Sequence, residues 1–333
     1  MIKLPGLIDP HVHLRDPGQT HKEDFRSGTK AALAGGFTYL LDMPNNKEPV
    51  TTLKRLKKKM SISKSKSLCF VGFYAGSLGN NLEELMKMEP YVYGLKLYLN
   101  KTTGNYLISS DKLKNIFVAW KSRKPILFHA ESDIIQDVLD KAKSTNKRVH
   151  ICHVSSVSEL KSIIEARKRG VRVTCGVTPH HLFLSVNDAK RLGAFGLMKP
   201  EVQKGFREFV WKNLKHIDVI ESDHAPHTKQ EKKSSQPPFG VPNLETTLPL
   251  LINAVTKKKL SVKRLIELCH DNPKKIFGIK TDRNTYVEID EKEEYIIDNK
   301  NLLSKCGWSP YSGMKVRGKV KKVYFKGKLA YVA

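Results

Sequence analysis

The stretch GLIDPHVH, residues 6–13, begins with a short apolar run and closes with two histidines spaced two residues apart. In a β-strand, residues two apart face the same side, so His11 and His13 are expected to project together from the end of one strand. Two imidazoles on one face are the geometry of two ligands on a single metal ion. Two histidines on a strand are also compatible with surface residues, so this interpretation depends on the rest of the chain.

Seven more short apolar segments follow, each rich in Val, Ile, Leu, Phe or Tyr and bounded by Gly, Pro or polar residues. The predicted strands cover residues 6–13, 37–43, 68–75, 92–99, 125–129, 148–154, 171–177 and 217–222. Helical patterns alternate with them and cover residues 24–34, 81–88, 111–121, 132–144, 156–169 and 203–214. Eight strands that alternate with helices predict a (β/α)8 barrel.

The last part of the chain has a different pattern. Two helices are expected at 244–257 and 261–270, and the polar, proline-rich segment 228–243 is expected to be a long loop of the barrel. Beyond these helices, alternating residues predict a few antiparallel strands. The sequence therefore predicts an α/β protein with a (β/α)8 TIM barrel over residues 4–283 and a small C-terminal β appendage over residues 284–333, packed on the barrel.

The composition limits the classes of function. Hydrophobic residues make up 40% of the chain, which is enough for a substantial core, and no apolar run approaches the roughly 20 residues that cross a membrane. The net charge of +26 would suit a nucleic-acid-binding protein, but the lysines are dispersed and no nucleic-acid-binding motif accompanies them. A solvated, lysine-rich surface is the better interpretation, and its positive field would help to attract an anionic substrate.

The five cysteines are scattered and form no CxxC pair. This pattern indicates reduced thiols in a cytosolic protein and not a disulfide framework. The segment that carries the first motif begins at residue 4, so no secretory signal is expected. A cytoplasmic location is therefore predicted.

Polar residues also stand at or near the ends of other predicted strands. His129, His153 and Asp223 each end a strand, and Lys96 lies inside strand 92–99 among apolar residues. Barrel active sites form at the carboxyl ends of the strands, and four histidines with one aspartate can supply most ligands of two divalent ions. An ammonium is disfavoured when buried, and a neutral amine can take up CO₂ to form a bridging carbamate. A lysine whose charged end reaches solvent is the alternative.

These residues belong to a series of motifs that resembles the dihydroorotases of the amidohydrolase superfamily. In chain order the motifs are GLIDPHVHLRDPG (6–18), HKEDF (21–25), MPN (43–45), GLKLYL (94–99), FHAE (128–131), HICHVSS (150–156), TPHHLFLS (178–185) and SDHAPH (222–227). The resemblance covers nearly the whole chain from residue 4. It is closest to the dihydroorotase domain of the multifunctional animal pyrimidine-synthesis enzyme.

The resemblance implies a zinc-dependent enzyme that interconverts N-carbamoyl-L-aspartate and L-dihydroorotate in de novo pyrimidine (UMP) synthesis. It implies two Zn²⁺ per chain, bridged by Lys96 in its N6-carboxylated form and by a hydroxide. Asp223 would be a metal ligand and also the catalytic group that moves the proton. The metal ligands that the resemblance implies are His11, His13, Lys96, His129, His153 and Asp223.

The resemblance also implies a set of substrate-binding residues. Arg15, Asn45 and His227 would hold the α-carboxylate of the substrate, and the fork of a guanidinium suits a carboxylate. Thr102 matches the threonine of a lid loop over the substrate. Lys199 stands where the animal-type enzymes carry arginine, so it would meet the substrate as a point charge or would lie on the surface.

Three other functions are weighed beside this one. A hydantoinase or allantoinase would share the metal ligands, but the resemblance implies that those enzymes lack an arginine at position 15. An inactive homologue that serves as a scaffold for aspartate transcarbamoylase would be expected to have lost metal ligands, and none is missing. Nucleic-acid binding rests on charge alone. The resemblance implies a homodimer with possible binding to aspartate transcarbamoylase, and neither nucleic-acid nor membrane partners are expected.

Overall fold

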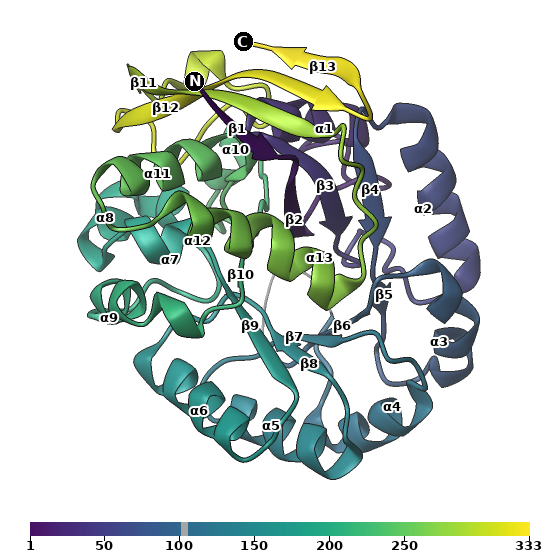
Figure 1. The fold of residues 1–333 in the computed structure, drawn as a ribbon. Helices are drawn as coiled ribbons and strands as arrows, with labels where there is room; N and C mark the ends of the chain where they lie inside the picture. Colours follow the sequence, from purple (N-terminus) through teal and green to yellow (C-terminus); the bar gives the residue numbers. More distant parts are fainter. Residues whose placement is uncertain (101–105) are drawn as a thin grey trace.

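A closed ring of parallel strands with helices on its outside forms the body of the molecule (Figure 1). The computed structural model describes residues 1–100 and 106–333. The strands of the ring are β2 (Leu7–Val12), β3 (Phe37–Asp42), β4 (Phe70–Phe73), β5 (Ala75–Gly76), β6 (Leu95–Tyr98), β7 (Ile126–His129), β8 (Val149–Ile151), β9 (Val173–Val177) and β10 (Val219–Ile220). Only Tyr74 separates β4 from β5, and together they correspond to one predicted strand, so the (β/α)8 barrel is confirmed.

The helices follow the strands in the alternating order that the sequence predicts. Their bounds are α1 (Phe25–Ala34), α2 (Leu53–Lys66), α3 (Leu82–Met88), α4 (Leu113–Ala119), α5 (Ile134–Thr145), α6 (Val157–Lys168), α7 (Pro179–Phe183), α8 (Val186–Leu192), α9 (Phe206–Lys212), α10 (Lys229–Lys232), α11 (Leu244–Thr256), α12 (Val262–Ile266) and α13 (Asn272–Phe277). Side-chain caps begin several of them: Asp24 starts α1 and Ser156 starts α6, each in a capping box.

A four-stranded antiparallel sheet lies at one side of the barrel, in the order β1-β11-β12-β13 (Figure 1). Its strands are β1 (Ile2–Pro5), β11 (Tyr286–Ile296), β12 (Lys315–Phe325) and β13 (Lys328–Val332), which confirms the predicted antiparallel strands at the C-terminus. The difference is β1, which pairs with β11 through Ile2 and Ile289, whereas the predicted barrel began at residue 4. Four residues are too few to show a period, so sequence alone could not separate β1 from β2. The division at residues 283 and 284 stays a prediction.

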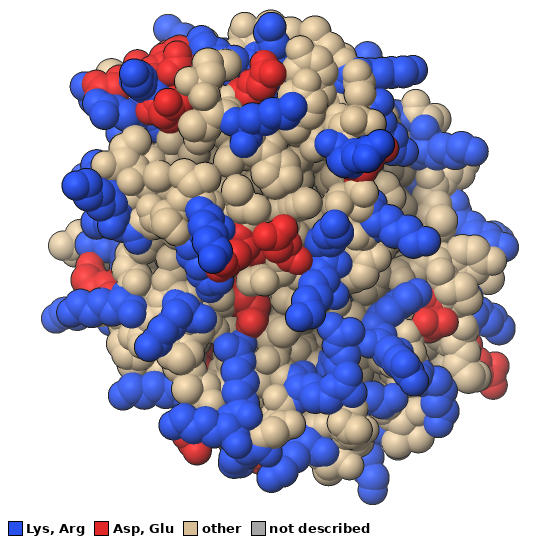
Figure 2. Space-filling model, in the orientation of Figure 1, with Lys and Arg blue, Asp and Glu red and all other residues tan. Residues whose placement is uncertain are grey.

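Positive charge is spread over the surface. Figure 2 shows lysine and arginine side chains across the whole visible face, with a few acidic groups between them, as a solvated lysine-rich surface requires. Within the described part of the chain, none of the helices combines the length and the apolar composition that a membrane span needs.

A buried ion pair holds the segment after β3, which leads to the predicted site residue Asn45. The Lys59 Nζ atom lies 2.7 Å from the Asp42 carboxylate and also donates to the Met43 carbonyl and the Asn46 side chain, at 2.7 and 2.8 Å. The other oxygen of Asp42 accepts from the backbone N–H of Leu14 at 2.8 Å. Both charged groups are buried, so each depends on the other for its charge.

Replacing Lys59 with Met should therefore destabilise the protein, because it leaves the Asp42 carboxylate buried without a counter-charge. The expected loss is about 3–5 kcal/mol in the free energy of unfolding, measured by urea titration. Lys58→Met, one residue earlier on the exposed side of α2, is the matched control and should change stability by less than about 0.5 kcal/mol. Equal stability of the two variants would contradict the proposed importance of the ion pair.

Candidate functional site

A pocket lies at the carboxyl ends of the barrel strands, where barrel enzymes carry their active sites. The residues that line it are His11, His13, Arg15, Asn45, Tyr98, His129, His153, Lys199, Asp223, Ala225, Phe239 and Gly240. Two other predicted site residues lie next to it: the Lys96 Nζ atom is 5.1 Å from the centre of the Tyr98 ring, and His227 contacts Arg15. The predicted lid residue Thr102 lies outside the described residues.

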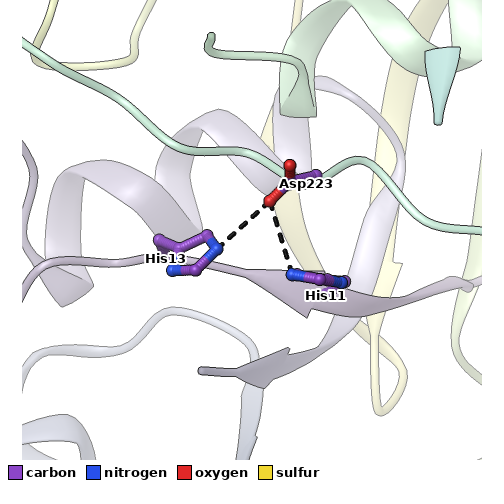
Figure 3. Close-up of side chains that lie close together, drawn as sticks. All are labelled: His11, His13 and Asp223. Atoms are coloured by element: carbon purple, nitrogen blue, oxygen red, sulfur yellow. Dashed lines mark hydrogen bonds and ion pairs between the residues drawn. The ribbon is translucent and has the colours of Figure 1, made fainter. Parts of the chain in front are cut away.

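The two histidines at the end of β2 point at one carboxylate (Figure 3). The Nε2 atoms of His11 and His13 lie 3.4 and 3.1 Å from the same oxygen of Asp223, which follows β10. The prediction that His11 and His13 point in the same direction, because residues two apart in a strand face the same side, is therefore correct. Burial alone would raise the pKa of Asp223, but the neighbouring His11 and His13 hold it well below its usual value. Asp223 is thus a carboxylate that faces two imidazoles.

A second pair of imidazoles lies beside the first. The His129 Nδ1 atom, at the end of β7, is 3.0 Å from the Nε2 atom of His153, which follows β8. Burial lowers the pKa of both residues, and it lowers the pKa of His13 to about 3. The rings are therefore neutral, which is the form in which histidine binds a metal. The His153 Nδ1 atom has no hydrogen-bond partner among the described residues, and the His129 Nε2 atom lies 3.5 Å from a Glu131 carboxylate oxygen.

Lys96 lies on β6 and is 0% exposed, so the alternative in which its charged end reaches solvent is wrong. The hydrogen-bond partner that the described residues supply to its Nζ atom is the Cys152 Sγ atom, at 3.0 Å. Burial raises the pKa of that thiol to about 12, so Cys152 does not supply a negative charge. A buried ammonium without an anionic partner is unfavourable, which suits a lysine whose amine is chemically modified and carries no positive charge.

A carboxylate that the sequence analysis did not single out lies behind His11. Glu221 is 0% exposed, and its Oε2 atom is 3.4 Å from His11 Nδ1 and 3.5 Å from His150 Nε2. Its other oxygen accepts from the backbone N–H of His153. Gly176 leaves room for this group, because a Cβ atom there would lie 2.5 Å from the Glu221 carboxyl carbon.

The two ring nitrogens of His11 therefore face two different carboxylates, Asp223 on the pocket side and Glu221 on the inner side. A carboxylate behind a metal-binding histidine fixes the ring orientation and makes the ring a stronger ligand. The signal for Glu221 was present in the sequence, because a charged residue stands next to the apolar strand Val219–Ile220 and needs a partner when buried. What the sequence lacked was the identity of that partner.

Donors gather at the other end of the pocket. The Arg15 Nη2 atom lies 3.2 Å from the His227 Nε2 atom, and both side chains are buried. Asn45 contacts His13, with its Oδ1 atom 2.7 Å from His13 Nδ1. Lys199 lines the pocket, is 26% exposed at its side chain, and lies 2.8 Å from a Glu201 oxygen. An arginine and a histidine side by side form a site for an anion.

Three of these residues have a left-handed backbone conformation, which side chains other than glycine rarely adopt. Their φ angles are +62° at Arg15, +40° at His153 and +46° at Asp223. Each lies two or three residues beyond the end of a barrel strand, where the chain turns away from the ring. Such strain is found at sites where the position of a side chain matters more than local stability.

Comparison with known sequences identifies the family to which the chain belongs and several similar proteins. The model of the amidohydrolase family matches residues 2–330. The whole chain aligns with the "Multifunctional protein CAD" of Squalus acanthias at 40% identity and covers 15% of that protein. It also aligns over its whole length with the "Multifunctional protein pyr1-3" of Dictyostelium discoideum, at 39% identity, and covers 15% of that protein. The chain thus spans about 15% of the length of these two relatives. It is 36% identical to the "Dihydroorotase" of Pyrococcus furiosus, with 98% of this chain and 80% of that protein covered.

Solved structures with the same fold have different names. The L-hydantoinase (dihydropyrimidinase) of Arthrobacter aurescens superposes with a TM-score of 0.92 and 25% identity, over 98% of this chain and 85% of that one. The inactive dihydroorotase-like domain of a Chaetomium thermophilum CAD-like protein superposes with a TM-score of 0.85 and 26% identity, over 100% and 96% of the two chains. The fold therefore does not choose between these functions, and the side chains of the site must do so.

Glu221→Gln should weaken metal binding, because the amide removes the negative charge behind His11 while it keeps the size of the side chain. The expected loss in affinity is about 10–100-fold, measured by competition with a chelator. Glu245→Gln is the matched control, since Glu245 is a half-buried carboxylate that accepts from the backbone of Leu303 and Ser304 and is not one of the residues that line the pocket. If both variants hold metal equally well, Glu221 has no orienting role.

Proposed function

Because the chain belongs to the amidohydrolase family, we propose that it is a dihydroorotase, which interconverts N-carbamoyl-L-aspartate and L-dihydroorotate in de novo pyrimidine (UMP) synthesis. The observation that carries the proposal is the anion site formed by Arg15 and His227 next to the histidine cluster. A hydantoinase acts on cyclic amides without a ring carboxylate and has no need of such a site. Dihydroorotate carries this carboxylate, and the two donors would bind it.

We propose that the chain holds two zinc ions. His11, His13 and Asp223 would bind one ion, and His129 and His153 the other. The residues present fit these ions, because His11 and His13 face the Asp223 carboxylate and the His153 Nδ1 atom has no hydrogen-bond partner among the described residues. In its carboxylated form, Lys96 would supply the anionic bridge between the ions.

When bound, the two ions would polarise the ring carbonyl and acidify a water beside it. Asp223 would then work as general base and general acid. In hydrolysis its carboxylate would take the proton of the attacking water and deliver it to the ring nitrogen that leaves. In ring closure it would take the proton from the carbamoyl nitrogen. Ring closure consumes one proton overall, so acid favours dihydroorotate and alkali favours carbamoyl-aspartate.

The remaining residues would position the substrate. Arg15 and His227 would bind its carboxylate, and Asn45 would join them through its amide nitrogen, since its oxygen faces His13. That contact also has an effect on His13: if Nδ1 donates its proton to Asn45, the Nε2 atom keeps its lone pair for a metal. We propose further contacts from Lys199, which lines the pocket, and from Thr102.

An inactive scaffold is a weaker proposal, because the predicted metal ligands are all present: His11, His13, His129, His153 and Asp223 line one pocket, and Lys96 lies next to it. The homodimer and the binding of aspartate transcarbamoylase stay proposals, and the second is motivated by the multifunctional relatives. We place the protein in the cytoplasm, where its five free and buried cysteines would stay reduced.

The proposed function is tested by an ultraviolet assay of purified, zinc-loaded protein. Dihydroorotate should be hydrolysed in a chelator-sensitive manner, whereas dihydrouracil, hydantoin and allantoin should be poor substrates because they lack the carboxylate. Turnover of hydantoin or allantoin in preference to dihydroorotate would refute the proposal. Absence of turnover with two zinc ions bound would favour the scaffold.

Asp223→Asn should abolish turnover, because the amide cannot accept the proton, and the expected loss is about 10²-fold or more. Circular dichroism and the urea midpoint should show that the variant is folded. Turnover near the rate of the unaltered protein would exclude Asp223 as the group that moves the proton.

A further inference from the structure

Lys22 contacts His227 on the side of the ring that faces away from Arg15. Its Nζ atom lies 3.2 Å from His227 Nδ1, whereas the Arg15 guanidinium lies 3.2 Å from His227 Nε2. Lys22 is buried and belongs to the HKEDF motif, and the proposed mechanism does not use it. The Glu231 carboxylate lies 3.0 Å from the same Nζ atom and supplies a counter-charge for its ammonium.

This contact, together with a carbonyl on the other side of the ring, decides where the His227 proton resides. Burial and the nearby cations Arg15, Lys22 and Lys232 lower the pKa of His227, so its ring is neutral and carries one proton. An ammonium can only donate a hydrogen bond, so the Nδ1 atom that meets Lys22 is the acceptor, whereas the Nε2 atom lies 2.9 Å from the Phe239 carbonyl, which can only accept. The Arg15 Nη2 atom, also a donor, then lies beside the Nε2–H at 3.2 Å and is not its hydrogen-bond partner. The single proton of the ring is then on Nε2, on the side of the pocket.

The position of this proton determines what the pocket can bind. With the proton on Nε2, His227 donates to the Phe239 carbonyl at 2.9 Å, and the same N–H lies beside the Arg15 guanidinium, so a carboxylate bound there would share this donor with the carbonyl. Two neighbouring donors suit a carboxylate, whereas the other tautomer would present a lone pair and repel it. We propose that Lys22 is a positioning residue that holds His227 in the Nε2–H tautomer and so makes it a partner of Arg15 in binding the substrate carboxylate.

The backbone around His227 is held independently of Lys22. The Trp308 indole donates to the His227 carbonyl at 2.7 Å, and the Arg15 Nε atom donates to the Pro226 carbonyl at 3.2 Å. Loss of the Lys22 side chain should therefore allow the His227 proton to move between the two ring nitrogens, while the backbone around His227 stays in place. The inference about substrate binding rests on the proposed dihydroorotase function, but the inference about the tautomer does not.

The direct test is nitrogen NMR of protein labelled with ¹⁵N-histidine, with the His227 signals assigned by their loss in His227→Asn. We expect a neutral ring with the proton on Nε2 in the unaltered protein, and a shift toward Nδ1–H or a mixture in Lys22→Met. Lys22→Arg should keep the Nε2–H form, because arginine also can only donate. Lys229→Met removes a charge from the exposed start of α10 and should leave the His227 signals unchanged.

Kinetics of the zinc-loaded variants test the consequence for the substrate. Lys22→Met should raise KM for dihydroorotate about tenfold and change kcat by less than about twofold, because the carboxylate is held equally in the ground state and the transition state. Lys22→Arg should restore KM, and metal content should stay the same in all variants.

Two results would overturn the inference. One is an unchanged Nε2–H tautomer in Lys22→Met, and the other is an unchanged KM despite a changed tautomer. If the unaltered protein does not turn over dihydroorotate, the proposed function fails, and the NMR spectra still decide the role of Lys22 in the tautomer.

Discussion

The backbone hydrogen bond from the His13 N–H to the His224 carbonyl, at 2.8 Å, joins the first and last strands of the barrel. The bridge between Val12 and His224 lies at the same point. Closure of the ring there brings the end of β2 against the segment after β10, and only then do His11 and His13 meet Asp223 (Figure 3). His129 and His153 reach the same face through the pairing of β7 with β8, because parallel strands end on one face of the ring.

The pocket combines two regions with opposite electrostatic character. In one, burial lowers the pKa of His13, His129 and His153 while neighbouring histidines lower the pKa of Asp223, which favours the neutral imidazoles and the carboxylate that divalent metal ions require. In the other, Arg15 and the buried Lys22 provide positive charge around a neutral His227. A substrate with an amide ring and a carboxylate would therefore have a single orientation, with the ring at the histidines and the carboxylate at the guanidinium.

The comparisons show why the fold is a poor guide to the reaction. A hydantoinase and an inactive dihydroorotase-like domain both superpose closely on this chain, at TM-scores of 0.92 and 0.85. Both share the barrel, so differences in chemistry must come from side chains at the strand ends. In this chain the side chains that bear on this choice are the Arg15–His227 pair and the predicted metal ligands beside it.

The sequence by itself determined the eight-strand barrel and the direction of most site residues. Strand periodicity and the position of polar groups at strand ends are local properties, and they placed His11, His13, His129, His153 and Asp223 on one face. Only the tertiary structure decided which residues lie behind them. The contact of Glu221 with His11 and the contact of Lys22 with His227 join residues about 200 positions apart, and β1 reaches β11 across the whole chain. No local pattern encodes such contacts, because they exist only after the ring has closed and buried charges have found their partners.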